Sequence, residues 1–285
     1  MSNRPALTLA IRMTLAAFRR HNASRFGAAL AFYIVFSVAP MLLLAITIAG
    51  ALLGRDAERE ILDRVGGSVG PAVGMAIAAM VAGAASRPVG WLATIFGATT
   101  LYFGLSGVYR QIDDALRTIW AEKGEEMAPA PEAIQRRAGT VLLVLAVIVI
   151  VILSVVADAA IAATGRYAGA RLAGGAWLWH AAGLVASTLV LTMIFAAVFR
   201  FLPRARVSWA DAAAGAAVTA FLFVAGKFAL GFYFGKAAVG SAFGVAGSIV
   251  VVLLWSYWSA QIFFFGLEFT HVYATRRSLP SGERR

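Results

Sequence analysis

Apolar residues along this chain come in long, nearly unbroken runs of the kind that membrane-spanning helices require. Six runs pass this test of length: residues 28–53, 89–108, 139–157, 177–199, 210–232 and 245–270. A helix rises about 1.5 Å per residue, so about 20 mostly apolar residues cross a hydrocarbon core about 30 Å thick. The runs lack the alternation of apolar and polar residues that is typical of a barrel strand. The pattern therefore predicts an all-α fold, a polytopic membrane helical bundle with six transmembrane helices.

The last run is the most informative, because polar residues interrupt it. Leu254, Trp258, Gln261, Phe265 and Glu268 follow one another at intervals of three or four residues, which places them on one face of a helix. An ionisable side chain in a membrane costs about 2.5 to 3.5 kcal/mol on insertion scales. We therefore expect the face with Gln261 and Glu268 to point into the bundle.

Two segments outside the runs carry apolar residues at helical spacing and are predicted to be interfacial amphipathic helices. The apolar residues are Leu7, Ile11, Leu15 and Phe18 in the first segment and Ile112, Leu116 and Ile119 in the second. Each helix lies either along the membrane surface or against the cytoplasmic end of the bundle, and the pattern leaves both open. Residues 69–85 are uncharged and rich in Ala and Gly, so we expect an exterior interfacial or re-entrant helix there.

Composition and charge agree with an integral membrane protein. Of the 285 residues, 61% are hydrophobic and 14% are charged, and the mean hydropathy is +0.80. Seventeen of the 25 Lys and Arg residues fall on the side of the predicted topology that holds both termini, which the positive-inside rule assigns to the cytoplasm. The predicted parts are a cytoplasmic amphipathic N-terminal segment (1–27), a six-span membrane domain (28–274) and a basic cytoplasmic tail (275–285).

The candidate chemistry is sparse. The net charge of +11 does not indicate nucleic acid, because the basic residues are scattered singly and in pairs. The chain has no Cys, and His21, His180 and His271 lack the paired spacing of a zinc site. Phosphate-binding loops and nucleophile elbows are also missing from the sequence. We expect no enzyme activity, no cofactor and no metal, with membrane lipids as the surroundings and partners.

The first run combines Tyr33 and Ser37 with Pro40, which removes one backbone hydrogen bond and tends to kink a helix. Such a kink either lines a pathway or is a structural feature of the span. Glycines also have the spacing of close helix contacts, in the pairs Gly231 with Gly235 and Gly240 with Gly244. The alternative for these glycines is a flexible or re-entrant segment between the last two spans.

Two charged side chains within the apolar runs, Glu268 and Lys227, are expected to need ion-pair partners. Glu268 lies about 15 Å toward the cytoplasm from the centre of its span and Lys227 about 9 Å toward the exterior of its own, so their depths differ too much for pairing. We expect Lys227 to pair with Asp158, at the exterior end of the third span. The candidate partners of Glu268 are Arg200, Arg204 and Arg206. Alternatively, each charge extends to the interface and needs no partner.

Four groups of residues stand along the chain in a characteristic order. They are Phe32-Tyr33 with Ser37 and Pro40, Ala115-Leu116 with Ile119-Trp120, Pro203 with Val207-Ser208-Trp209, and Leu254-Trp255-Ser256-Tyr257 with Gly266-Leu267-Glu268. This order resembles that of the YihY/BrkB family of bacterial inner-membrane proteins, over nearly the whole chain. One departure is Arg117, where the family usually has Asn.

The resemblance implies six spans, a location in the bacterial cytoplasmic (inner) membrane and, for some members, a virulence or serum-resistance label. Some members are also named ribonuclease BN. This sequence does not support that name, because it offers no metal site or catalytic cluster that would hydrolyse RNA.

The leading functional hypothesis is a transporter or flippase-like protein for an anionic lipid or a small solute. Its candidate pathway or bundle residues are Tyr33, Ser37, Pro40, Asp158, Lys227, Gln261 and Glu268. Among these, we expect Gln261 to meet a substrate and Glu268 to brace the cytoplasmic end. The alternative is a non-transporting scaffold for envelope organisation, which needs only small-residue seams and an exposed surface patch.

Overall fold

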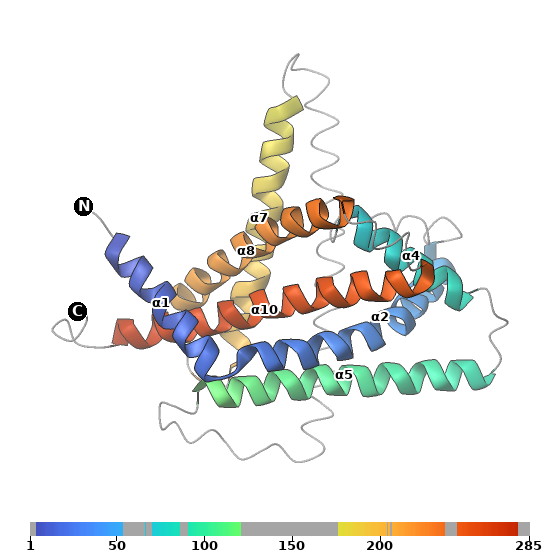
Figure 1. Ribbon diagram of the computed structural model, residues 1–285, viewed down its shortest axis with the longest axis horizontal. Coiled ribbons are helices and arrows are strands. Elements are labelled where there is room, and N and C mark those ends of the chain that lie inside the picture. The colour runs from blue at the N-terminus through green and yellow to red at the C-terminus, as the bar shows by residue number, and fades with distance from the viewer. Residues whose placement is uncertain are drawn as a thin grey trace. The chain divides into compact units, whose positions relative to one another are not determined.

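The regular elements of the structure, a computed structural model, are all α-helices. The residues described are 4–53, 66, 70–85, 91–120, 176–203, 205, 207–236 and 244–278, and no strand occurs among them. The helices in Figure 1 are α1 (Arg4–Arg20), α2 (Ala23–Leu53), α4 (Pro71–Ala85), α5 (Trp91–Trp120), α7 (Ala176–Phe201), α8 (Trp209–Lys236) and α10 (Gly244–Ser278). The all-α prediction is therefore confirmed for this part of the chain.

Five of the six predicted runs coincide with α2, α5, α7, α8 and α10, and the run at 139–157 lies outside the described residues. By length and composition, Trp209–Phe234 of α8 and Gly247–Arg277 of α10 are the two described helical segments long and apolar enough to cross a membrane. Shorter apolar segments are Ala23–Val38, Pro71–Met80 and Ser187–Phe201.

The chain divides into two compact units, each assembled from separate stretches of sequence. Unit 1 comprises Met1–His21, Leu116–Val224 and Phe265–Arg285, and unit 2 comprises Asn22–Ala115 and Ala225–Phe264. The divisions fall at the break between α1 and α2 and inside α5, α8 and α10. Each of these three helices therefore has one part in unit 1 and the other part in unit 2.

The break between α1 and α2 is a tight turn at His21 and Asn22. Asn22 has a φ of 52°, in the left-handed region that Asn tolerates better than most residues. The N–H of His21 donates to the carbonyl of Ala17 at 2.9 Å, and the N–H of Arg25 donates to the carbonyl of Asn22 at 2.9 Å. Backbone hydrogen bonds therefore continue on both sides of this turn, which we call the α1–α2 elbow.

α1 packs through a face of small and polar residues and leaves bulky apolar residues outside. The buried residues are Ala10, Thr14, Ala17 and His21. The exposed apolar residues, between 37% and 44% exposed, are Leu9, Ile11, Met13 and Leu15. Figure 1 shows α1 lying across the C-terminal part of α10. Packing on the bundle is thus observed for this amphipathic segment, but largely through a face other than the predicted apolar one.

The second predicted amphipathic segment is part of a longer helix. α5 runs without interruption from Trp91 to Trp120, and Ile112, Leu116 and Ile119 on it are each at most 8% exposed. These side chains are covered by protein. Of the two predicted arrangements, packing within the bundle is therefore the one observed for this segment.

In unit 2, α4 packs into a cluster of apolar side chains. The cluster contains Val73, Ala76 and Ile77 of α4, Phe234 of α8, and Val251 and Val252 of α10, with Val35 and Val38 of α2 packed against it. The helix has 15 residues, a length of about 22 Å that falls short of a hydrocarbon core of about 30 Å. A helix within residues 69–85 is therefore confirmed. Its burial fits a re-entrant helix better than one on the membrane surface, and its place in the membrane stays a prediction.

α2 and α5 approach closely where α5 has glycines. A methyl group added at Gly104 would overlap the Ser37 hydroxyl, and one added at Gly107 would overlap the Tyr33 ring. The Ser37 hydroxyl donates to the carbonyl of Tyr33 at 2.8 Å, within its own helix. Pro40 lies inside α2, half-buried. Tyr33 and Ser37 therefore contribute to a helix contact within unit 2.

In unit 1, α8 and α10 meet at a glycine–threonine seam, made of Gly215 and Thr219 on α8 and Gly266 and Thr270 on α10. A methyl group at Gly215 would overlap the Thr270 hydroxyl, and one at Gly266 would overlap the Thr219 hydroxyl. Each hydroxyl donates to the glycine carbonyl on its own helix, at 2.7 Å for Thr219 and 2.8 Å for Thr270. Such close backbone contacts stabilise helix pairs in lipid, where burial of apolar surface adds little.

We predict that G215A and G266A each lower the free energy of unfolding by about 1 to 3 kcal/mol, because the added methyl group forces the two helices apart. The matched control is G231A in α8. Within the described residues nothing lies within 4 Å of a Cβ at this exposed glycine, contrary to the packing role that its spacing predicted. G231A should be neutral or stabilising by up to about 1 kcal/mol.

Thermal unfolding of the purified protein, followed by circular dichroism in one detergent, measures the three variants side by side. Equal melting temperatures for G215A, G266A and G231A would show that the seam contributes nothing to stability.

Candidate functional site

Two polar side chains of α10 hold the chain on either side of the α1–α2 elbow. In unit 2, Gln261 Nε2 donates to the carbonyl of Ser24 at 3.1 Å. The amide lies against Gly27, where an added methyl group would overlap it. In unit 1, Nδ1 of His21 lies 2.7 Å from Oε1 of Glu268. α10 is thus attached by side chains to the last residue before the turn and to the start of α2.

Glu268 is the most deeply buried ionisable residue of this site. Its side chain is 0% exposed and that of His21 is 6% exposed. One turn away, the rings of Phe18 and Phe265 lie 6.2 Å apart between centroids. Apolar rings thus pack beside the pair, and a buried imidazole–carboxylate contact at this distance is a strong, charge-assisted hydrogen bond when the imidazole is protonated.

A second histidine lies on the same stretch of α10. His271 follows Glu268 by three residues, which places the two on one face of the helix. It is 6% exposed, and its ring lies 5.2 Å from that of Trp120, between centroids. We call His21, Glu268 and His271 the histidine–glutamate cluster. Its side chains are three titratable groups buried in unit 1.

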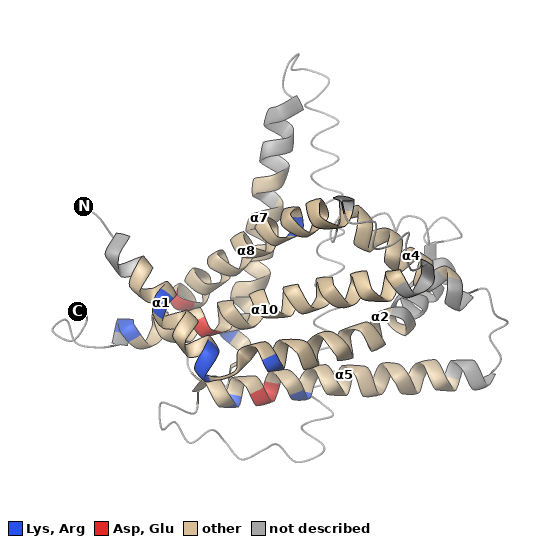
Figure 2. Cartoon of the chain, viewed as in Figure 1, with Lys and Arg blue, Asp and Glu red and all other residues tan. Residues whose placement is uncertain are grey.

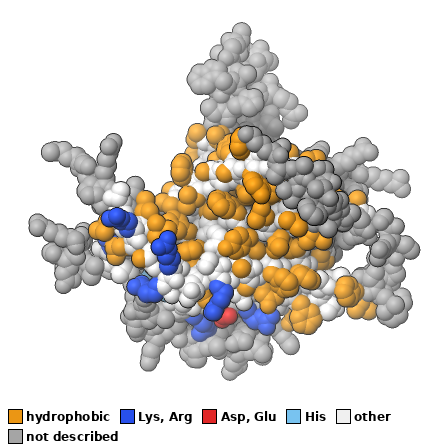
Figure 3. Space-filling model, viewed as in Figure 1, with side chains coloured by type: hydrophobic (Ala, Val, Ile, Leu, Met, Phe, Trp, Pro, Cys, Tyr) orange, Lys and Arg blue, Asp and Glu red, His pale blue; other side chains and the backbone are white. Residues whose placement is uncertain are grey.

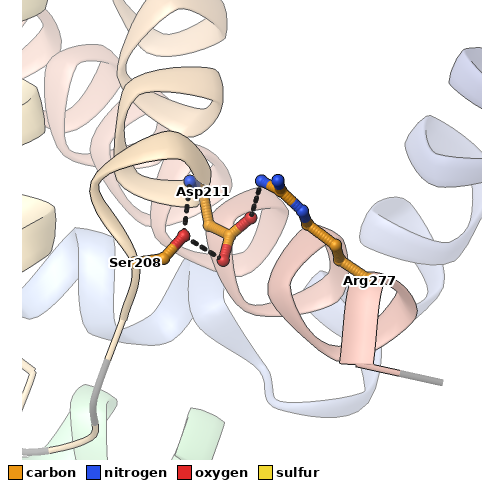
Figure 4. Close-up of polar contacts among 3 residues, drawn as sticks. All are labelled: Ser208, Asp211 and Arg277. Carbon is orange, nitrogen blue, oxygen red and sulfur yellow. Dashed lines mark hydrogen bonds and ion pairs between the residues drawn. The ribbon is translucent and has the colours of Figure 1, made fainter.

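A second polar group joins the end of α10 to the start of α8 (Figure 4). The Ser208 hydroxyl donates to Oδ2 of Asp211 at 2.6 Å and accepts from the backbone N–H of Asp211 at 3.2 Å. Arg277 Nη1 donates to Oδ1 of Asp211 at 3.4 Å. Asp211 in the first turn also complements the positive end of the α8 dipole. The Ser-x-x-Asp spacing is a capping signal that our sequence analysis did not use.

Basic side chains of unit 1 gather where α1 meets the C-terminal end of α10. In Figure 2 this region carries basic residues in blue and acidic residues in red, whereas the remainder of α10 is uncharged. The arginines are Arg12, Arg19, Arg20, Arg276 and Arg277. In the view of Figure 3 the described surface is mostly apolar away from these side chains. The charge asymmetry therefore runs along α10, with its basic end at the C-terminus.

The predicted inward face of α10 is present only in part. Glu268 is buried, as expected, whereas Leu254 and Trp258 are 38% and 44% exposed. A repeat of three and four residues averages 3.5 and drifts around a helix of 3.6 residues per turn. The amide of Gln261 donates to the carbonyl of Ser24, and the expected contact of Gln261 with a substrate stays a prediction.

The charged partners predicted for the spans are less fully described. Lys227 is half-buried on α8, and Asp158 lies outside the described residues. Arg204 and Arg206 also lie outside them, while Arg200 Nε is buried on α7 with no hydrogen bond in the described part of the chain. These pairings stay predictions. The partner that the structure gives Glu268 is His21, 247 residues away, which sequence reasoning missed.

In the helices and turns described, no three His, Asp or Glu side chains lie together in a way that would hold a metal ion. The side chains of the histidine–glutamate cluster can form hydrogen bonds and exchange protons.

We predict that H21A and E268A each lower the free energy of unfolding by about 3 kcal/mol or more, because each leaves a buried ionisable group without the contact it makes in the native protein. The H21A/E268A double variant should lose less than the sum, with a coupling of at least about 1 kcal/mol. R19A, at an exposed neighbouring position of α1, is the control and should change stability by less than about 0.5 kcal/mol. Additive losses in this double-mutant cycle, measured by thermal unfolding, would contradict the interaction.

Comparison with known proteins gives one match. The family described as "Virulence factor BrkB" matches residues 14–285. Neither a curated protein nor a solved structure matches the chain. The family match covers nearly the whole sequence, including α10 and the elbow, and agrees with the resemblance seen in the residue groups around Tyr33, Trp120, Trp209 and Glu268. The chain belongs to the BrkB family, also called YihY/BrkB, and is an integral membrane protein of that family.

Proposed function

We propose that this protein is a transporter or flippase that moves an anionic lipid or a small anionic solute across the bacterial cytoplasmic membrane. The observation that carries the proposal is the fully buried Glu268 held by His21. An ionisable group within a membrane protein is costly and is typically retained where it serves a substrate or ion pathway.

The charge distribution supports an anionic substrate. In unit 1, the last turn of α10 carries Arg276 and Arg277. α1, which lies across this part of α10 (Figure 1), carries Arg12, Arg19 and Arg20. A field of one sign raises the local concentration of ligands of the opposite sign. The basic end therefore favours anions over cations as the species that approaches the cluster.

The proposed topology has six spans with both termini in the cytoplasm. Helices α2, α5, α7, α8 and α10 have 31, 30, 26, 28 and 35 residues, and each exceeds the roughly 20 residues needed to cross a bilayer. The sequence run at 139–157 supplies the sixth span of the proposal. An even number of spans returns the C-terminus to the side of the N-terminus, in agreement with the bias of Lys and Arg.

Because the chain contains no Cys, single-cysteine variants test this topology directly. S281C in the tail should react with a membrane-impermeant maleimide only after the cells are opened, whereas R171C, between the third and fourth predicted spans, should react in intact cells. Labelling of S281C in intact cells would overturn the proposed orientation.

A scaffold that organises envelope proteins or lipids is the second candidate, and specific contacts favour it. Tyr33, Ser37 and Gln261, all expected along a pathway, take part in helix contacts. This leaves fewer polar side chains to line a route. Membrane lipids are the partners in both proposals, and neither requires enzyme chemistry or nucleic acid.

Reconstitution distinguishes the two candidates. Vesicles with wild type, E268Q or R110Q, a change at an exposed arginine of unit 2, are loaded either with fluorescent phosphatidylglycerol, whose inner-leaflet fraction is read by dithionite quenching, or with labelled phosphate or pyruvate. We expect movement of at least one anion that falls at least tenfold in E268Q and is retained in R110Q. Protein-dependent movement of none of these probes would favour the scaffold.

A further inference from the structure

The outward surface of α1 combines bulky apolar side chains with arginines. Leu9, Ile11, Met13 and Leu15 are between 37% and 44% exposed, and Arg12, Arg19 and Arg20 are also exposed. α1 packs into unit 1 through another face, on which Ala10, Thr14, Ala17 and His21 are buried. These four bulky apolar side chains are thus left largely outside the packing of unit 1.

Helical geometry sorts these residues into distinct strips. At 100° per residue, Ile11 and Leu15 fall with Phe18 on one flank of the buried face, and Leu9 and Met13 fall on the other. Arg12 and Arg19 lie between the flanks, directly opposite the buried face. The guanidinium groups therefore border the Ile11–Leu15 flank along its length.

The Ile11–Leu15 flank continues onto a helix that is apolar and long enough to cross a membrane. Phe18, on this flank, contacts Phe265 of α10, and α10 contains the candidate span Gly247–Arg277. The flank with Leu9 and Met13 lies on the other side of the buried face of α1. The Ile11–Leu15 flank is thus the one that adjoins this stretch of α10.

We propose that this surface, made of Ile11, Arg12, Leu15 and Arg19, is a binding site for anionic phospholipids. The apolar side chains enter the boundary between headgroups and acyl chains, and Arg12 and Arg19 bind the lipid phosphates. Charge complementarity selects anionic over zwitterionic headgroups, since each Arg near a surface contributes to attraction by anionic lipid. The site does not rest on the proposed transport: it anchors α1 to the membrane through lipid.

Environment-sensitive labelling tests which flank meets lipid. In the full-length, Cys-free chain, L15C and L9C are labelled with a fluorophore and placed in nanodiscs that contain phosphatidylglycerol and spin-labelled quencher lipid. The proposal expects quenching at residue 15 at least threefold stronger than at residue 9. Equal quenching at the two positions, or stronger quenching at residue 9, overturns it.

Bound lipid tests the choice of headgroup. Native mass spectrometry compares phosphatidylglycerol and phosphatidylcholine bound to wild type, to R12Q/R19Q and to R110Q, an exposed arginine of α5 in unit 2. R12Q/R19Q should lose about 30-fold in affinity for phosphatidylglycerol, equivalent to about 2 kcal/mol, with phosphatidylcholine unchanged. R110Q should match wild type. An unchanged or equally reduced affinity for both lipids in R12Q/R19Q overturns the site.

Melting temperatures of R12Q/R19Q and wild type establish that the fold is kept, which is expected because both arginines are exposed. The vesicle assay with E268Q reports on transport separately. Loss of phosphatidylglycerol binding in R12Q/R19Q with no transport of any probe would uphold this site and count against the transporter.

Discussion

The contact between His21 and Glu268 is the constraint on which the arrangement of α1 depends. A carboxylate with no exposed surface needs a polar partner, and the 2.7 Å contact to the imidazole supplies one. His21 directly follows the last residue of α1. The hydrogen bond that it makes with Glu268 therefore also fixes the position of the end of α1 against α10. Gln261 acts on the other side of the turn, through the carbonyl of Ser24. Two polar residues that a lipid environment would penalise are thereby used to hold a change of chain direction.

Packing elsewhere relies on small residues. In lipid the hydrophobic effect gives helices little reason to associate, so the backbones must approach closely enough for dispersion forces and local hydrogen bonds to act. The glycine–threonine seam allows this close approach in unit 1. Each threonine hydroxyl donates a hydrogen bond to a carbonyl of its own helix. In unit 2, the side chain of Ser37 packs against Gly104 and that of Tyr33 packs against Gly107. Large apolar side chains such as Phe96, Phe103, Phe221 and Phe228 are left exposed, as lipid-facing positions of an integral membrane protein are expected to be.

Several elements followed from the sequence because their causes are local. Runs of apolar residues longer than a membrane is thick form helices, since the backbone has no other partner in lipid. The helices α2, α7, α8 and α10 accordingly contain the runs predicted for them. The prediction of which glycines form helix contacts was less successful, also for a physical reason. Gly231 has the spacing of a contact residue, yet no described residue lies within 4 Å of a Cβ added there, whereas Gly215 and Gly266 do form close contacts. Spacing within one helix does not say which face another helix covers.

The sequence by itself determined the helical class, the family and the basic end of α10, since each depends on residue order and composition alone. The tertiary structure decided which polar groups meet. Glu268 could be recognised as a residue in need of a partner, but its partner lies 247 residues away on α1, and depth along the spans pointed to arginines at the end of the fourth. The tertiary structure also determines that α1 buries Ala10 and Thr14 and exposes Ile11 and Leu15. A helix that has both a small face and a bulky face can pack through either, and the choice is made by the shape of the helix it meets.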